Sequence, residues 1–567
     1  MAEIAALKDQ FSKTETKSEN LIPEDTLSPE LVIAFCSPIG TPVHQVVKVL
    51  ESILINNFSY ECHTIKLSDY IKELAEIDKN PPKEFERRKL YIEKGDLLRE
   101  QICTTVLAEK AIHEINRFRE DHFKKQKKLN RFAFIIDSIK NQNELDLLKF
   151  IYRDECYCIG AFAPLSLRLQ ELTNLGMTKQ EATTLVELDS GLYVPKDKRD
   201  FSQTVQKTFP QSDLFVRLGS NNKDVLKGKL ERFAHLIFGS DVITPTPDEA
   251  AMFAAASAAV NSGCLSRQVG ACITDRKGNI ISVGWNDVPS PGGGLYRCDS
   301  PEDLRCGKTI TGECHNSKEK ETIIDDIIKN LDKDVSETVR KKISDVLKGS
   351  QISSLIEFSR AIHAEMFAVI QAGKLNGALI EGGNLYCTTY PCHNCARHLV
   401  AAGIVNIYYI EPFAKSLAVK LHFDSLTENE DPNEKSKVRI LAFDGVAPNR
   451  FLEFFQQNQR KDRSPVKNYE ARPRYQMTLE AIPLLEQLIV KNLIKKLEKI
   501  MKENKSISAS INKSESVQVE LNFSFKANEP KRAIKVLNFE EHRKKKSDKE
   551  YYRKVEQSVQ MLIEKYN

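Results

Sequence analysis

Short apolar runs alternate with longer amphipathic stretches through the first 240 residues of the chain. Residues 31–36, 132–136 and 156–162 are apolar runs of strand length, and helical patterns lie between them. Strands that are apolar on both faces and are separated by helices are typical of a parallel sheet covered by helices. Residues 28–240 are therefore predicted to form an α/β domain.

A loop rich in Gly and Pro follows the first apolar run and precedes a helical pattern that extends to about residue 54. The loop contains Ser37, Gly40 and Thr41. A strand, a tight loop and a helix in this order open many nucleotide-binding domains, because a helix N-terminus attracts phosphate. The loop lacks the G-K-[ST] sequence of a working P-loop, and the next lysine, Lys48, lies inside the helix. We expect a regulatory loop that binds a nucleotide or an RNA without phosphoryl transfer; the alternative is a domain kept for folding or oligomerisation.

A second pattern begins at about residue 241 and extends to about residue 460. Thr246 and Glu249 form a capping box around Pro247, and an Ala-rich helix follows. Strands are expected over 269–274, 279–285, 384–388 and 404–410, and helical segments over 318–347 and 391–402. A further helix is expected to begin near Ser353 and to carry His363. The second domain is therefore also predicted to mix strands and helices.

Three potential metal ligands lie at the helices of this second domain. His363 supplies an imidazole, and Cys392 and Cys395 are three residues apart on one face of a helix. Cys392 is expected in the first turn, where unpaired backbone N–H groups favour a thiolate. Three protein ligands leave one tetrahedral position of a zinc ion open to water, as in catalytic sites. The spacing therefore predicts a catalytic Zn²⁺.

The remaining requirement is a base beside the metal that is not itself a ligand. Glu365 follows His363 by two residues and meets this requirement. The combination H-x-E with P-C-x-x-C is the signature of zinc deaminases that act on nucleobases. A C-x-x-C pair alone is a weak signal, but the order of all these residues, with Pro391 before the first Cys, is specific. Glu365 is therefore the predicted catalytic residue.

These residues resemble the deoxycytidylate deaminase family, and within it the two-domain bacterial members described as anti-phage dCTP deaminases. The resemblance is carried by residues 243–250, 265–271, 285–289, 292–296, 359–365, 388–395, 409–412 and 415–418. It implies an N-terminal parallel-sheet domain like that of P-loop nucleotide kinases and a C-terminal three-layer α/β/α cytidine-deaminase fold. It also implies a homo-oligomer that acts on free dCMP or dCTP and lowers the dCTP supply available to phage replication.

The resemblance also assigns contacts to the substrate. Asn286 would contact the sugar, Arg267 and the loop of Gly292, Gly293 and Gly294 would contact the phosphates, and Thr388 to Pro391 would help to frame the base. Ala364 is a further predicted substrate-binding residue. Lys415, just past a strand end, is a weaker candidate. For Arg267 an ordinary surface charge, and for the Gly run a flexible loop, are the alternatives.

An insertion in the second domain carries further potential ligands. Cys298, Cys306, Cys314 and His315 are residue types that suit a second, structural zinc. Seven residues separate the successive cysteines, which is not a standard spacing. A second zinc site is therefore one of two alternatives here, the other being ordinary cysteines.

Charge and composition indicate the nature of the two terminal segments and the cellular location of the protein. The net charge is +4, but residues 484–567 hold 19 Lys or Arg against 12 Asp or Glu, so the basic excess belongs to the C-terminal region. Residues 1–27 are expected to be an extension, and 461–567 a helical, basic and partly disordered tail. No run approaches the roughly 20 apolar residues of a membrane span, and residues 1–20 do not resemble a secretory signal. A cytoplasmic protein with no membrane partner is expected.

Two rival functions use the same residues. The basic tail would suit a deaminase that acts on cytidine within RNA or single-stranded DNA. However, these basic residues are remote in sequence from the zinc site, and polynucleotide readers usually stack bases on exposed aromatic side chains. The other rival is a nucleotide sensor without catalysis, which the presence of Glu365 disfavours for the second domain.

Overall fold

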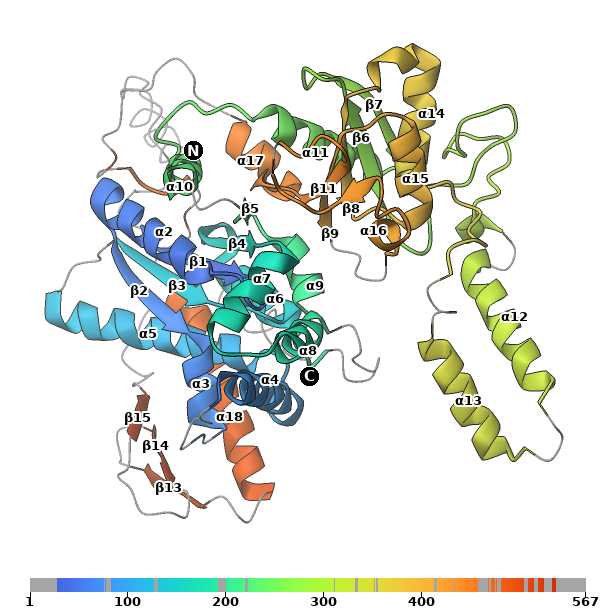
Figure 1. Cartoon of the computed structure of the whole chain (residues 1–567). Coiled ribbons are helices and arrows are strands. Elements are labelled where there is room, and N and C mark those ends of the chain that lie inside the picture. Colours follow the sequence, from blue (N-terminus) through green and yellow to red (C-terminus); the bar gives the residue numbers. More distant parts are fainter. Residues whose placement is uncertain are drawn as a thin grey trace, which may run out of the picture.

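In the computed structural model, two sheets and their covering helices make up most of the molecule (Figure 1). The structure describes residues 28–503 and parts of 508–536, apart from gaps at 76, 78–82, 127–130, 192–199, 220–222, 310–311, 332–334, 351, 353–354, 412–415, 432, 457–467, 469–470, 475 and 477–480. The predicted N-terminal extension and Lys415 lie outside the described residues.

The first sheet has the strand order β12-β5-β4-β1-β3-β2. Five strands from the first domain are parallel to their neighbours: β1 (Leu31–Cys36), β2 (Glu61–Lys66), β3 (Phe132–Asp137), β4 (Cys156–Phe162) and β5 (Leu214–Arg217). The sixth strand, β12 (Gly445–Val446), is antiparallel to β5 and comes from the far end of the second domain. The predicted parallel α/β domain is confirmed, and the chain of the second domain completes its sheet.

Helices cover both faces of this sheet because its central strand is apolar on both sides. Alternate residues of β1 enter two different core clusters, one with α5 and α6 and the other with α2 and α10. The helices of the domain are α2 (Val43–Phe58), α3 (Leu67–Leu74), α4 (Glu84–Gln101), α5 (Val106–Gln126), α6 (Gln142–Tyr152), α7 (Leu165–Asn174), α8 (Lys179–Ser190), α9 (Val205–Thr208) and α10 (Lys223–Phe238).

The second sheet has the strand order β10-β11-β9-β8-β6-β7. Its strands are β6 (Gly270–Thr274), β7 (Ile280–Trp285), β8 (Asn384–Thr389), β9 (Asn406–Glu411), β10 (Leu426–Thr427) and β11 (Val438–Ala442), of which β8 to β11 run parallel and β6 is antiparallel to both neighbours. Its helices are α11 (Pro247–Ala259), α14 (Ala364–Asn376), α15 (His393–Ala401) and α16 (Ala418–Leu421). Residues of α11 and of α14 and α15 enter separate core clusters, so the sheet lies between two helical layers. A short helix, α17 (Phe451–Phe455), follows β12, and its Phe454 belongs to the core cluster that includes α2 and α10.

Glu249 ties the two domains together. It closes the predicted capping box with Thr246, and its carboxylate also pairs with Arg232 of α10 at 2.8 Å. The same carboxylate accepts a hydrogen bond from the backbone N–H of Val446 in β12 at 2.9 Å. One buried side chain therefore starts a helix of the second domain and holds both that helix and β12 against the first domain.

The chain returns to the first domain after the second one. Helix α18 (Ala481–Glu503) packs against α5, and its Leu485, Ile489 and Leu493 belong to the core cluster of the first domain. Glu486 has no exposed area and accepts hydrogen bonds from Arg119 and from Tyr152, the latter at 2.7 Å. The helix within the predicted tail is thus an integral part of the first domain, and only β13 (Ser508–Lys513), β14 (Val519–Ser524) and β15 (Ala533–Val536) are described beyond it.

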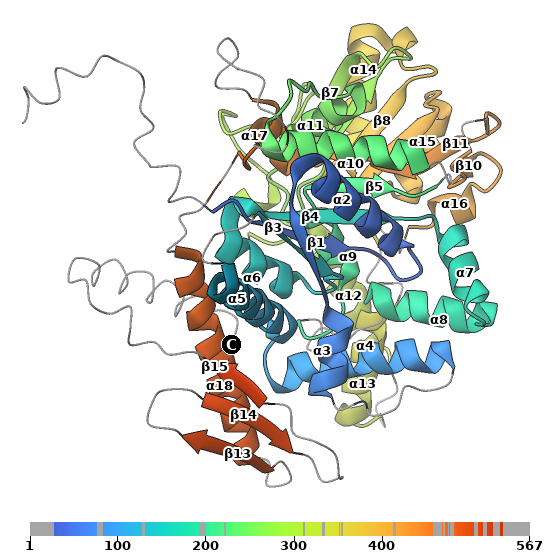
Figure 2. The ribbon, with the colours of Figure 1, turned by 90° about the vertical axis from the view of Figure 1, so that its left-hand side faces the viewer.

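The insertion of the second domain forms a pair of helices that projects from the body (Figure 1). The predicted helical segment is divided into α12 (His315–Lys329) and α13 (Glu337–Gly349), which pack against each other. Among the described residues of α13 none is buried. In Figure 2, which is turned by 90° from Figure 1, α14 lies at the top of the molecule, and the first sheet and α18 lie below it.

Candidate active site

The first ligand lies at the start of a helix, and not within one. The helix expected from Ser353 begins at Ala364 instead, and His363 is its N-cap with extended backbone angles. The preceding Ile362 forms a bridge with Asp287, to whose carbonyl oxygen it donates at 3.0 Å. This bridge holds the chain extended up to His363, which explains why the helix cannot start earlier.

The two thiols are placed by the end of a strand and the start of the next helix. β8 ends at Thr389, and Cys392 is the N-cap of α15, where its sulfur accepts a hydrogen bond from the N–H of Cys395 at 3.4 Å. Both cysteines are buried. The strand and the helix lie where they were predicted, and Cys392 is the N-cap of the helix, one position before the first turn in which it was expected.

The three donor atoms converge on one point. Nδ1 of His363 lies 3.4 Å from Sγ of Cys392 and 3.3 Å from Sγ of Cys395, and all three atoms lie within 4.8 Å of one another. Zinc bonds of about 2.1 Å to nitrogen and 2.3 Å to sulfur place tetrahedral ligands about 3.6 Å apart. The separations and the donor set therefore fit a zinc ion, with one position left for another ligand.

The Cys392 thiolate is the charge in the cluster that suits a cation. The hydrogen bond with Cys392 raises the pKa of His363 to about 9, so a metal ion would have to displace the proton of this imidazole. The hydrogen bond from Cys395, followed by the interaction with His363, lowers the pKa of Cys392 and favours its thiolate. A thiolate at the start of a helix, facing an imidazole, is the form that binds a metal.

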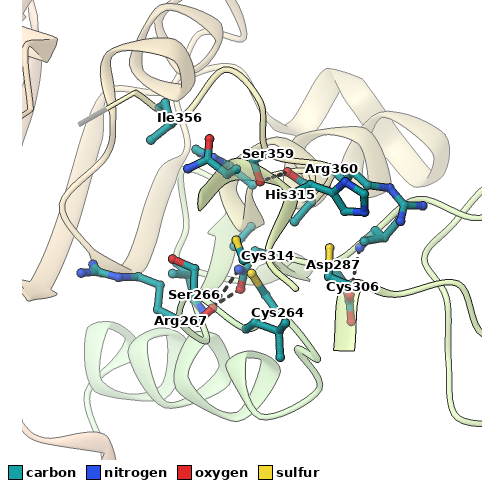
Figure 3. Close-up of a pocket in the computed structure, with 18 of the residues that line it drawn as sticks. Cys264, Ser266, Arg267, Asp287, Cys306, Cys314, His315, Ile356, Ser359 and Arg360 are labelled. Carbon is teal, nitrogen blue, oxygen red and sulfur yellow. Dashed lines mark hydrogen bonds between the residues drawn. The ribbon is translucent and has the colours of Figure 1, made fainter. Parts of the chain in front are cut away.

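Glu365 lies in the first turn of α14, beside the ligands. It is 5% exposed, and burial raises the pKa of its carboxyl group. A cavity of about 370 Å³ is lined by Glu365, His363 and Cys392, with walls from the segment 263–269, the segment 286–288 and both ends of the insertion (Figure 3). A buried carboxyl group beside a metal cluster in a cavity is a group that can hold and move a proton near a bound molecule.

Comparisons with known proteins place this cavity in a family. A family model described as the cytidine and deoxycytidylate deaminase zinc-binding region matches residues 245–411. The deoxycytidylate deaminase of Enterobacteria phage T2 is 36% identical over 159 residues, which are 27% of this chain and 74% of the phage protein. The chain belongs to the deoxycytidylate deaminase family. The phage T4 deoxycytidylate deaminase is 35% identical over 159 residues, covering 27% of this chain and 72% of the phage protein.

A solved dCMP deaminase is also similar. The cyanophage S-TIM5 enzyme in complex with dCMP and dUMP is 19% identical, with a TM-score of 0.21, and the match covers 35% of this chain and 99% of that one. The family match stops short of the first domain and of α18. In the part of the chain that the structure describes, no helix has the length and apolar character needed to span a membrane.

Three predicted substrate residues of this deaminase family member, Asn286, Arg267 and Ala364, line the cavity. Asn286 is buried, and its amide accepts from the N–H of Val269 at 2.7 Å and donates to the carbonyl of Arg267 at 2.9 Å. Arg267 is half-exposed and pairs with Glu411 at 3.3 Å. Asn286 therefore fixes the backbone of the wall that presents Arg267. Ala364 is buried and lines the cavity as well.

The structure brings only part of the other predicted contacts into the cavity. Gly292, Gly293 and Gly294 have positive φ angles of 86°, 107° and 81° and form a turn outside the cavity lining. Of the predicted stretch Thr388 to Pro391, Thr389 and Tyr390 line the cavity, whereas the Thr388 hydroxyl accepts a hydrogen bond from the N–H of Gly270 at 3.1 Å and is not in the lining. The contacts predicted for Gly292–294 and Thr388 therefore find no support in this arrangement.

The predicted second zinc ligands are only partly gathered. Cys306, Cys314 and His315 line the cavity together with Cys264, whereas Cys298 is exposed and lies elsewhere (Figure 3). Within the described residues, the only group of three or more His, Cys, Asp or Glu ligands within metal-binding distance is the one at His363. The structure thus gives no second ligand cluster, and a second zinc stays a prediction.

Sequence reasoning missed the residue that organises the cavity wall. Asp287 is 1% exposed, accepts from the N–H of Gly263 at 2.9 Å and lies 3.4 Å from the Arg305 guanidinium. Arg360, three residues before His363, also lines the cavity and was not predicted. Its position next to the signature histidine is the signal in the sequence that could have pointed to it.

The loop of the first domain is closed by side chains of the same chain. The N–H of Ile39 donates to the buried carboxylate of Asp189 at 2.7 Å, and Lys140 pairs with that carboxylate at 3.0 Å. Gly40 has φ +84°, and a Cβ there would lie 2.7 Å from the carbonyl oxygen of Arg168. At the predicted Ser37, Gly40 and Thr41 loop, a carboxylate therefore takes the loop N–H that an anionic ligand would need.

Proposed function

We propose that the chain is a zinc-dependent hydrolytic deaminase that converts deoxycytidine nucleotides to deoxyuridine nucleotides. The observation that carries the proposal is the convergence of His363, Cys392 and Cys395 within 4.8 Å, in the cavity that also holds Glu365. The relatives named deoxycytidylate deaminases support the choice of substrate. The proposed cofactor is one Zn²⁺ held by these three ligands.

The residues of the chain supply the proton transfers. A zinc ion with one histidine and two cysteine ligands acts as a Lewis acid and lowers the pKa of water toward 7. The Glu365 carboxylate accepts a proton from the attacking water and delivers it to the ring nitrogen N3, and a second proton goes to the amino group at C4. That group leaves as ammonia, so each turnover consumes one water and replaces an amino group by oxygen. Burial raises the pKa of Glu365, which suits a group that must both accept and donate.

The cavity walls suit a single nucleotide. Arg267, Lys320 and Arg360 line it around the proposed metal site, and cations of this kind pair with phosphate oxygens. We propose that Arg267 contacts a phosphate and that Asn286 acts by holding the Arg267 backbone. Both dCMP and dCTP fall within this proposal.

For the first domain, we propose a regulatory role without phosphoryl transfer. The occupied N–H of Ile39 and the engagement of Lys140 with Asp189 support it, because positioned donors and a free lysine are needed to bind a transferring phosphate. Transfer of phosphate from ATP to any nucleotide acceptor by the purified chain would contradict this part of the proposal.

The biological role is proposed from the family resemblance: a cytoplasmic homo-oligomer that depletes dCTP during phage infection. Plaque counts on cells that express the wild-type chain or Glu365→Ala test the role, and light scattering tests the assembly. Equal plaque counts with both chains would contradict the anti-phage role.

Ammonia release tests the proposed reaction. The purified chain is given dCMP, dCTP, cytidine and a cytosine-containing oligonucleotide at equal cytosine concentrations. We expect turnover of dCMP or dCTP to exceed that of the other two at least tenfold. Preferred turnover of the oligonucleotide would favour the polynucleotide deaminase, and no turnover of any of the four would favour the nucleotide sensor.

A further inference from the structure

A second and larger cavity, of about 890 Å³, lies between the two domains. Its first wall stands at the carboxyl ends of three adjacent parallel strands, with Pro42 after β1, Pro164 after β4 and Arg217 at the end of β5. The opposite wall is the segment 428–431 after β10, together with Asp444. In Figure 2, α7 of the first domain lies beneath α16 and β10 of the second. The carboxyl edge of an open α/β sheet is where ligands of such folds bind.

The two walls carry opposite charge. Arg217, Lys223 and Lys229 come from the first domain, and Glu428, Glu430, Asp431 and Asp444 come from the second. Two pairs cross the cavity edge: Arg217 lies 3.5 Å from Glu430, and Lys229 pairs with Asp444. Among the ion pairs of the described residues none includes Lys223, which is exposed. The first-domain wall therefore keeps a cation for a ligand.

Lys223 is also the first residue of α10, a helix of 16 residues. The N-terminus of such a helix carries partial positive charge, which adds to the charge of the lysine. Beside it, Leu167, Leu218 and Leu226 give the cavity an apolar surface. An anion-binding corner, an apolar surface and carboxylate acceptors opposite are what a nucleoside phosphate requires for its phosphate, its base and its hydrogen-bond donors.

We propose that this interdomain cavity binds a nucleoside phosphate, with its phosphates at Lys223 and its base and sugar toward Glu428. The volume lies within the range of about 300–1,000 Å³ that is usual for small-molecule sites. The ligand does not use the loop of Ser37, Gly40 and Thr41, whose Ile39 N–H is already bound by Asp189.

One hydrogen bond connects this cavity to the zinc ligands. Glu428 accepts from the Tyr390 hydroxyl at 2.8 Å, and Tyr390 lines the active-site cavity and precedes Cys392 by two residues. A ligand that donates to Glu428 competes with the Tyr390 hydroxyl for the same carboxylate. Binding between the domains therefore changes the rate of deamination. The proposed effect on the rate of deamination rests on the proposed function, whereas the proposed binding of a nucleoside phosphate does not.

ATP is a suitable probe because adenine is not the base that the proposed reaction deaminates. Its binding to the full chain is measured by calorimetry, with inorganic tripolyphosphate as the probe that lacks a nucleoside. We expect one ATP per chain, tighter binding of ATP than of tripolyphosphate, and at least a tenfold loss of ATP affinity in Lys223→Glu. The matched control is Lys227→Glu, because Lys227 lies on the same helix but pairs with Glu231 outside the cavity.

The proposed effect of ATP on the rate of deamination is tested on the same proteins, with dCMP at a concentration below KM. ATP should change the rate at least threefold in the wild type and in Lys227→Glu, and should have no effect in Lys223→Glu, whose rate without ATP stays at the wild-type value. Glu428→Ala should still bind ATP through Lys223, with lower affinity because one acceptor is lost, and should lose the response. Absence of ATP binding, equal affinity for tripolyphosphate, or unchanged affinity in Lys223→Glu would overturn the site. Binding without any change in rate would overturn the connection through Tyr390. A chain that binds ATP but deaminates nothing would refute the proposed function and leave the binding site standing.

Discussion

Nδ1 of His363 lies 3.4 Å from Sγ of Cys392, although the two residues are 29 positions apart in the chain. Each is the N-cap of a helix, and the two helices lie in the same layer over the second sheet. The site is therefore built where two helix starts meet, which places N-terminal backbone N–H groups around thiolate ligands.

The first prediction follows from this geometry. Cys392→Ser should lose most of the zinc that the wild type holds, at about one ion per chain, because a serine hydroxyl is a much poorer ligand than a thiolate. Its thermal unfolding should also shift to lower temperature. Metal analysis and thermal scans check both. Cys62→Ser is the control, since Cys62 is partly exposed in β2 of the first domain and belongs to neither ligand set, and full zinc content in Cys392→Ser would mean that the ligands lie elsewhere.

Asn286 should act on activity through the cavity wall. Asn286→Ala leaves the N–H of Val269 and the carbonyl of Arg267 without their partners, which costs about 1–3 kcal/mol. We expect KM for the nucleotide to rise more than kcat falls, because the Arg267 backbone loses its support. Asn279→Ala, in an exposed turn, is the matched control. Unchanged KM and stability in Asn286→Ala would remove Asn286 from this role.

The signature residues and the main strands could be predicted from the sequence because their signals are local. A strand of alternating core contacts such as β1, a capping box such as that of Thr246, and the H-x-E and P-C-x-x-C patterns are each written in a few neighbouring residues. The start of α14 could not be predicted in this way. Its position depends on the bridge between Ile362 and Asp287, which are far apart in the sequence.

Contacts between distant segments also explain why the place of the tail helix and the exchange of a strand between the domains could not be predicted. In the sequence, Glu486 is one acidic residue of a basic, amphipathic helix, and nothing near it indicates burial. In the structure it accepts hydrogen bonds from Arg119 and Tyr152 of the first domain. Likewise, β12 is a two-residue strand that pairs with β5, which precedes the whole second domain in the sequence. Contacts between segments hundreds of residues apart leave no local pattern, so the sequence could not show that the two domains share a sheet and a core.

Glu486 therefore supplies a stability prediction. Glu486→Ala leaves the Arg119 guanidinium, which keeps its pair with Glu30, without its second buried partner, and loss of a hydrogen bond to a charged group costs about 1.5–3 kcal/mol. Denaturant unfolding of the full chain measures this. Lys495→Ala, exposed on the same helix, should stay within about 0.5 kcal/mol of the wild type. A chain that ends at residue 503 keeps α18 and should keep the wild-type stability, and a loss of stability in that chain would show that residues 504–567 support the fold.

His113 makes the stability of the first domain depend on pH. Burial lowers the pKa of His113 to about 4, whereas an unfolded histidine titrates at about 6.5. Between these values the unfolded chain binds the extra proton, so the free energy of unfolding falls as the pH decreases from about 6.5 to 4. At pH 5 this loss is about 2 kcal/mol relative to pH 7. His113→Gln should show a correspondingly smaller loss between pH 7 and pH 5, and an equal loss in both proteins would contradict the assignment.

The most direct test of the account is the rate of ammonia release from dCMP and dCTP by the wild type and by Glu365→Ala, with zinc content measured on the same samples. We expect the variant to keep the zinc, because His363, Cys392 and Cys395 are unchanged, and its turnover to fall at least 10²-fold, the usual contribution of a general acid or base. Near-normal turnover in a zinc-loaded Glu365→Ala protein would contradict it.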